Sequence, residues 1–252
     1  MTDTEKYLFD LNGYLALPEV LTRNELDALN SLLDERIAAE REPEETSFRF
    51  RDILTWGRPY RDLLAHPRVL PYLHALVGER CRLDHEYLDV IRQGLGPIGA
   101  HLHGGGAPHD PSQYYRVVDG RMYNGLIVAV FALKDVRPGD GGFACIPGSH
   151  KANFPLPAGW GDMTGELAPG VTPISCPAGS VILFTEALTH GTLPWRGTEE
   201  RRSVFLKYSP HFMAWSTLRY DPTAYPDLSL AARRMLEGPN SRYRGRPGAV
   251  EE

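Results

Sequence analysis

Short apolar segments separated by Gly- and Pro-rich turns make up the chain from Cys81 onward. The longest, residues 126–133, reads Leu-Ile-Val-Ala-Val-Phe-Ala-Leu and is apolar at every position. A strand that is apolar on both faces is expected in the centre of a covered sheet. Further strands are predicted at 87–91, 143–146, 181–184 and 203–208. Short strands between such turns are typical of an antiparallel sandwich or barrel, which is the predicted architecture of this region.

The first part of the chain has helical signals instead. Thr22 and Glu25 have the spacing of a capping box, and apolar residues then recur at helical spacing as far as Ile37. A second helix is predicted over 61–77, with Gly78 placed to end it. We therefore expect a single domain, residues 1–252, in which a helical N-terminal part of about 1–79 packs on a β-barrel.

Composition and charge argue against several classes of partner. The net charge is −5 and the lysines and arginines form no basic run, so neither a nucleic acid nor an anionic membrane is predicted as partner. The N-terminus is polar, and no apolar stretch approaches transmembrane length. Cys81, Cys145 and Cys176 are few and widely spaced, which is typical of reduced thiols. We expect a cytoplasmic protein, either a monomer or a homodimer.

Histidines gather in the segment 100–110, where His101 and His103 are followed by three glycines. Residues two apart on an extended strand share a face, so both imidazoles are expected to point the same way. Imidazole is a ligand that suits first-row transition metals. His190, in the sequence Leu-Thr-His-Gly-Thr, would complete the site from a distant strand. The sequence thus indicates a metal site that contains His103, His190 and a candidate third histidine, His101.

Arg201 and Ser203 follow His190 on the next predicted strand. A guanidinium group can bind a carboxylate with two parallel hydrogen bonds. Strand alternation places Arg201 and Ser203 on one face and turns Arg202 to the other. This spacing indicates a carboxylate site beside the metal. Asn124 is a further candidate for a hydrogen bond to the bound carboxylate compound.

Several short motifs occur together in a fixed order. They are Asn12-Gly13-Tyr14, Ala132-Leu133-Lys134-Asp135, Gly141-Gly142-Phe143, Ile146-Pro147-Gly148-Ser149-His150, and His190-Gly191 with Arg201 eleven residues later. With these motifs, the chain from about Phe9 to Ser209 resembles the phytanoyl-CoA dioxygenase family of iron(II)/2-oxoglutarate-dependent oxygenases. The resemblance implies a mainly β fold with flanking helices, namely the double-stranded β-helix (jelly roll, cupin-like).

The resemblance also implies roles for individual residues. His190 matches the distal iron ligand, Arg201 matches the arginine that holds the far carboxylate of 2-oxoglutarate, and Ser203 matches its hydroxyl partner. Iron(II), 2-oxoglutarate as cosubstrate and O2 are the implied cofactors. His103, His190 and Arg201 are the expected catalytic residues.

The chain departs from the family at the first metal motif, His-x-Asp, whose carboxylate completes a facial triad of ligands. In its place stands His101-Leu102-His103-Gly104-Gly105. In one interpretation His103 is the ligand and Gly105 occupies the carboxylate position, as in halogenases, which leaves room for chloride. In a second, His101 and His103 both bind the metal. In a third, a carboxylate arrives from elsewhere, with Asp110 and Glu186 as candidates.

The implied activity is oxidation of an unactivated C–H bond in a small molecule, by hydroxylation, desaturation or oxidative cyclisation. No acyl-CoA signature is visible, so the expected substrate is a natural-product biosynthetic intermediate. The alternatives are a His-x-Gly type halogenase, a non-catalytic jelly-roll binding protein that has lost iron, and a metal-dependent cupin-type enzyme that does not use 2-oxoglutarate.

Overall fold

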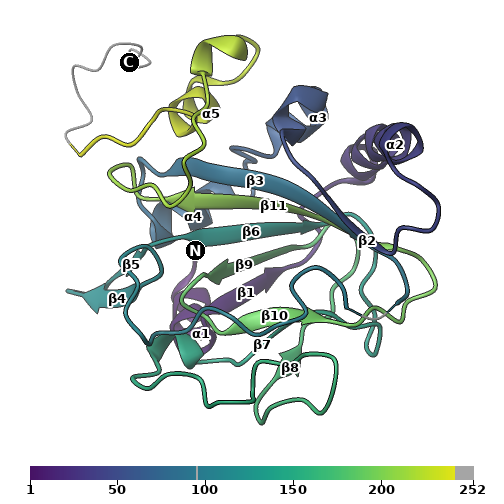
Figure 1. Ribbon diagram of the computed structural model, residues 1–252. Helices are drawn as coiled ribbons and strands as arrows, with labels where there is room; N and C mark the ends of the chain where they lie inside the picture. The colour runs from purple at the N-terminus through teal and green to yellow at the C-terminus, as the bar shows by residue number, and fades with distance from the viewer. Residues whose placement is uncertain (95, 242–252) are drawn as a thin grey trace.

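The computed structural model describes residues 1–94 and 96–241, which form two facing sheets with helices outside (Figure 1). The larger sheet has the strand order β1-β9-β6-β11-β3-β2, and the smaller has the order β10-β7-β8. The strands of the larger sheet are β1 (Tyr14–Leu17), β2 (Ser47–Phe50), β3 (Arg82–Ile91), β6 (Ile127–Ala132), β9 (Val181–Thr185) and β11 (Arg201–Ser209). Those of the smaller are β7 (Gly142–Cys145), β8 (Thr172–Pro173) and β10 (His190–Leu193). The predicted double-stranded β-helix is confirmed.

The segment predicted to be a central strand lies inside the larger sheet. β6 pairs antiparallel with β9 on one side and with β11 on the other. Its residues alternate between two apolar clusters. Phe131 belongs to the cluster between sheet and helices, whereas Val128 and Val130 belong to the cluster between the two sheets. The run is apolar at every position because both faces of this sheet are covered.

Helices cover the outer face of the larger sheet. They are α1 (Asp3–Asn12), α2 (Arg23–Glu40), α3 (Arg58–Asp62), α4 (Leu70–Leu76) and α5 (Leu230–Met235), with short 3-10 helices η1 (Ile53–Trp56), η2 (Ser149–Lys151) and η3 (Pro222–Ala224). α2 starts at the predicted capping box, in which Thr22 Oγ1 accepts from the Glu25 backbone and Thr22 N–H donates to the Glu25 carboxylate. Each bond satisfies a donor that the first helical turn leaves free.

The helix predicted over 61–77 is wrong as a single element. The structure has α3 and α4 instead, joined by turns around His66 and Pro67. Proline has no N–H to donate, and it disfavours the helical conformation of the residue before it. The N-terminal part also contributes two edge strands: β1 pairs with β9 and β2 pairs with β3. It therefore extends the barrel as well as covering it.

A small hairpin of β4 (Tyr115–Val118) and β5 (Arg121–Asn124) lies apart from both sheets. All three cysteines are buried and unbonded. Among the described residues, no helix has the length and apolar character needed to span a membrane. Residues 242–252 of the predicted single domain lie outside the described residues.

Leu206 tests the cluster between sheet and helices, in which it is fully buried on β11. We expect Leu206→Ala to lower the free energy of unfolding by about 2–5 kcal/mol, because it removes apolar contacts and leaves a cavity. Urea unfolding measures this loss. Val117→Ala is the control, since Val117 is 49% exposed on β4 and should change stability by less than about 0.5 kcal/mol. Equal effects of the two substitutions would contradict the assignment.

Candidate metal and cosubstrate site

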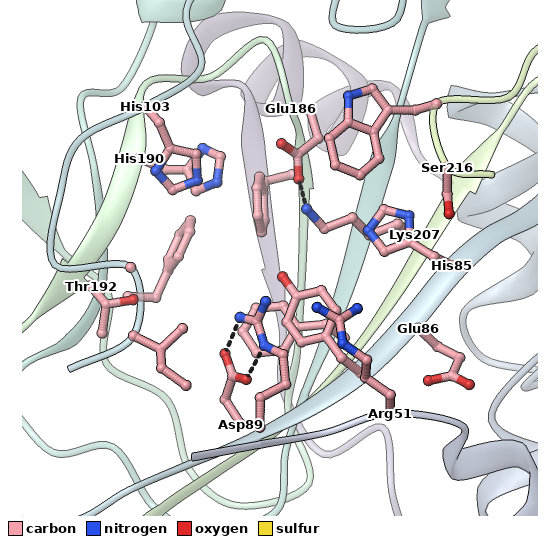
Figure 2. Close-up of a pocket in the computed structure, with 18 of the residues that line it drawn as sticks. Arg51, His85, Glu86, Asp89, His103, Glu186, His190, Thr192, Lys207 and Ser216 are labelled. Carbon is pink, nitrogen blue, oxygen red and sulfur yellow. Dashed lines mark hydrogen bonds and ion pairs between the residues drawn. The ribbon is translucent and has the colours of Figure 1, made fainter. Parts of the chain in front are cut away.

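A cavity of about 640 Å³ opens between the two sheets (Figure 2). Its volume lies within the range of small-molecule sites. His103 and His190 lie at one end, Arg201 lines the same cavity, and Arg51 and Glu86 lie at the opposite end (Figure 2). The cavity thus contains three of the residues that the sequence singled out, although they come from three separate segments.

Backbone pairing brings the two histidines together. His103 N–H donates to the His190 carbonyl, and His190 N–H donates to the His103 carbonyl, each at 2.9 Å. This isolated antiparallel pair sets the two ring centroids 4.2 Å apart. His190 is buried, whereas His103 is exposed at the cavity mouth.

Hydrogen bonds on the other ring nitrogens orient both imidazoles. His103 Nδ1 lies 2.9 Å from the His101 carbonyl, and His190 Nδ1 lies 2.7 Å from the Leu188 carbonyl. A carbonyl only accepts, so each Nδ1 carries the proton and each Nε2 keeps a free lone pair, as a metal ligand requires. Burial and the neighbouring charge of His103 lower the pKa of His190 to about 3, which keeps this imidazole neutral.

Gly104 makes the close approach of these segments possible. Its φ is +77°, and a Cβ there would lie 2.5 Å from the Leu188 carbonyl oxygen and 2.6 Å from that of Glu186. No side chain fits between His103 and the turn that precedes His190. The glycine following His103 is therefore required by the packing of the two ligand segments.

Gly105 stands at the position where the family's aspartate is expected, and its backbone also has a positive φ angle. Gly105 has φ +106°, and a Cβ there would lie 3.0 Å from Thr189 Oγ1. An L-residue would be strained in this backbone. Among the described residues, no three His, Cys, Asp or Glu side chains are grouped to hold a metal ion. His103 and His190 fit the metal as a pair of ligands.

His101 does not join this pair in the structure, and the three-histidine site stays a prediction. His101 pairs with Asp162, whereas His103 pairs with His190. Both are isolated bridges, and neither His101 nor His103 belongs to one of the strands of the sheets. The His101 ring packs on Gly161, where a Cβ would lie 2.1 Å from its Cε1. Asp110 is also outside the cavity lining, since its carboxylate binds the backbone and hydroxyl of Ser112.

Arg201 is the most distinctive charge of the cavity. It is 4% exposed, and its side chain passes over Gly142, where a Cβ would lie 3.2 Å from Arg201 Nε. Asp89 acts on it electrostatically, but both Asp89 oxygens are held by Arg49 at 2.6 and 2.8 Å. Within the described chain, no hydrogen bond or ion pair engages the Arg201 guanidinium. A buried cation without a partner is costly, so this arrangement suits an anionic ligand.

Ser203 and Arg202 follow the predicted alternation. Ser203 is buried on the Arg201 face of β11, and its role toward the cosubstrate stays a prediction. Arg202 turns to the opposite face, where it binds Asp34 and Glu200. The structure does not bring Asn124 to the cavity: its amide donates to the Leu76 carbonyl at 2.8 Å, and it does not line the cavity. The β4–β5 hairpin packs this residue against α4, away from the site.

Sequence reasoning missed a second buried ion pair in the cavity. Lys207 Nζ lies 2.5 Å from Glu186 Oε1 (Figure 2). Burial alone would lower the pKa of Lys207, but the Glu186 carboxylate raises it to about 12. The alternation that selected Arg201 and Ser203 also places Lys207 on the cavity face of β11. The alternation along this strand could therefore have identified Lys207 as a cavity residue from the sequence.

Gly104→Ala tests whether the glycine holds the two ligand segments together. We expect it to destabilise the protein and to weaken Co(II) binding, because the new methyl group displaces His103 from His190. Gly120→Ala is a matched control: its φ is +72°, but nothing lies within 4 Å of the added Cβ. It adds only the backbone strain of about 1 kcal/mol. Urea unfolding and Co(II) titration distinguish the two, and equal losses would contradict the packing argument.

Comparison with known proteins agrees with this geometry. The family model described as Phytanoyl-CoA dioxygenase (PhyH) matches residues 9–203. HygX from Streptomyces hygroscopicus with nickel and 2-oxoglutarate bound is 24% identical, with a TM-score of 0.78 over 100% of this chain and 97% of that one. SnoN, a non-heme alpha ketoglutarate dependent epimerase from nogalamycin biosynthesis, is 20% identical, with a TM-score of 0.56 over 82% of this chain and 81% of that one. The chain therefore belongs to the phytanoyl-CoA dioxygenase family and is a non-haem iron(II)/2-oxoglutarate-dependent enzyme.

Proposed function

We propose that this enzyme oxidises an unactivated C–H bond of a small, polar natural-product intermediate. The observation that carries the proposal is the buried Arg201 guanidinium, which has no hydrogen-bond or ion-pair partner among the described residues and lines the same cavity as His103 and His190. In this proposal His103 and His190 hold the iron, and Arg201 binds the far carboxylate of 2-oxoglutarate with Ser203 nearby. When bound, iron(II) with 2-oxoglutarate and O2 supplies the oxidant that removes a hydrogen atom.

The aromatic side chains around the site limit the access of water. Phe184 packs against His190 at a centroid distance of 4.6 Å and against Phe143 at 4.8 Å. Tyr87 stacks on Phe205 at 4.6 Å farther along the cavity. Exclusion of water strengthens the electrostatic contacts of bound groups and suppresses side reactions. These rings support a reaction with a strong oxidant in a shielded pocket.

The end of the cavity away from the histidines suits a substrate with several polar groups. Arg51, Asp52, Ser216 and Thr217 line it. Trp215, which is 53% exposed at the same end, stacks on His85 at 5.1 Å and offers a flat apolar surface. HygX has been solved with hygromycin B bound and SnoN with nogalamycin RO. These features favour a hydroxylated natural product over a purely apolar substrate.

Hydroxylation is the default outcome of this chemistry, and desaturation or oxidative cyclisation follows from the same hydrogen abstraction. The absence of a side chain at Gly105 favours one alternative, a halogenase in which chloride binds the metal. If the enzyme halogenates its substrate, replacing chloride by bromide in the reaction should change the mass of the product. If it oxygenates its substrate as proposed, the product should have the same mass with either halide. A protein that does not use 2-oxoglutarate gives no role to the buried Arg201.

Replacement of Arg201 tests cosubstrate binding directly. In the Ni(II)-loaded protein, we expect Arg201→Met to weaken 2-oxoglutarate binding by about 2–5 kcal/mol, or at least roughly 30-fold, because a buried charged pair loses one member. Isothermal titration calorimetry measures the loss. Without cosubstrate the variant should be at least as stable as the parent, since it removes an uncompensated buried charge.

Arg196→Ala is the control, because Arg196 is exposed outside the cavity. It should leave 2-oxoglutarate binding unchanged. The cosubstrate assignment fails if Arg201→Met binds 2-oxoglutarate as tightly as the parent protein, or if both substitutions weaken binding equally.

A further inference from the structure

The histidine pair leaves the metal without an anionic protein ligand. Four carboxylates line the cavity: Asp52, Glu86, Asp89 and Glu186. Both oxygens of Asp89 bind Arg49, and Glu86 lies at the opposite end from the histidines (Figure 2). Asp52 is close to Glu86, since its charge acts on that carboxylate. Glu186 alone among these four remains at the histidine end.

The backbone of Glu186 is fixed beside the first histidine. Glu186 follows β9 directly, and its N–H donates to the Leu126 carbonyl at 3.0 Å. Its own carbonyl is one of the two atoms that exclude a side chain at Gly104. The Glu186 side chain is buried, and it lines the same cavity as His103 and His190. Figure 2 shows this carboxylate and the two imidazoles at the same end of the cavity.

Lys207 holds one oxygen of this carboxylate. Its Nζ lies 2.5 Å from Oε1 as an ion pair, and neither carboxylate oxygen takes part in a hydrogen bond within the described chain. Carboxylates that ligate metals are themselves held by an outer hydrogen-bond donor. Lys207 can hold the carboxylate in this way through its ion pair, which leaves Oε2 available to a cation.

We propose that Glu186 supplies the third protein ligand of the metal, in place of the carboxylate that residue 105 lacks. This rests on the proposed function of the site. The carboxylate faces Lys207 in the structure, so its Oε2 reaches the metal by rotation of the side chain while the ammonium group follows Oε1. A carboxylate from the turn before His190 then completes a set of two histidines and one acidic residue.

The charges in the cavity agree with this ligand set. Iron(II), dianionic 2-oxoglutarate and Glu186 sum to −1, and the adjacent Lys207 restores neutrality. Arg201 adds one more positive charge beside the far carboxylate of 2-oxoglutarate in the proposed site, so the whole set sums to +1, against +2 without Glu186. Without Glu186 as ligand, the metal would need chloride or water in the third position. The proposal therefore favours oxygenation over halogenation.

Metal titration tests the proposal without any turnover. Co(II) is titrated under anaerobic conditions into the parent protein, Glu186→Met and Asp110→Asn, and its visible absorption is followed. We expect Glu186→Met to weaken Co(II) binding at least roughly 100-fold, beyond the usual effect of a residue behind the ligands. Asp110→Asn, the other candidate carboxylate, should bind as the parent does. Equal affinity of Glu186→Met and the parent would overturn the proposal.

A double variant separates ligation from a structural ion pair. Glu186→Met leaves Lys207 buried without its partner, whereas Glu186→Met with Lys207→Met removes both charges and keeps the volume. If Glu186 is a ligand, Co(II) binding stays weak in the double variant. Affinity restored to that of the parent would show that the pair only stabilises the fold, and would overturn the proposal.

The parent protein itself separates this inference from the proposed function. A parent protein that binds neither Co(II) nor 2-oxoglutarate would overturn both. A parent that binds both ligands, together with a Glu186→Met variant that also binds both, would retain the function and reject only Glu186 as ligand.

Discussion

The two-sided pattern of β11 is the constraint on which both the fold and the site depend. Arg201, Phe205 and Lys207 line the cavity, whereas Leu206 and Tyr208 belong to the core beneath the helices. A shift of one residue in the pairing with β3 or β6 would exchange these two sets, placing arginine and lysine in the apolar core. Burial of the apolar face of β11 beneath the helices stabilises this pairing register. The helices that cover the sheet therefore also fix the positions of the charged side chains on its other face.

The charged side chains of the cavity fall into two kinds. Arg49 with Asp89 and Lys207 with Glu186 are ion pairs formed within the chain, whereas Arg201 has no such partner in the described residues. A pair formed inside the protein offsets its own cost of burial, but an isolated guanidinium does not. The folding energy of the barrel carries that cost until a ligand supplies the anion. This contrast marks Arg201 as the buried charge of the cavity that the described chain leaves without an internal partner.

Local patterns in the sequence predicted much of this structure, but they did not predict which distant segments come into contact. The capping box at Thr22, the alternation of β11 and the spacing of His190 and Arg201 depend on neighbouring residues, and the structure contains each of them as predicted. The separation of His101 from His103 depends instead on pairing with Asp162 and with His190. No local sequence pattern specifies with which distant segment a residue will pair. The same holds for Asn124, whose hairpin packs on α4.

The glycines after His103 show why the missing aspartate is more than a single substitution. Gly104 allows two carbonyl groups of the 186–190 turn to approach the ligand strand, and Gly105 continues with a backbone that an aspartate would adopt only under strain. The turn that carries Glu186 and His190 therefore occupies the space next to Gly104 and Gly105 that side chains at these two positions would need. In the proposed site, the metal takes its ligands mainly from that turn, which the backbone pair of His103 and His190 holds in place. The ligand geometry thus depends on the packing of this turn rather than on the residue at position 105 alone.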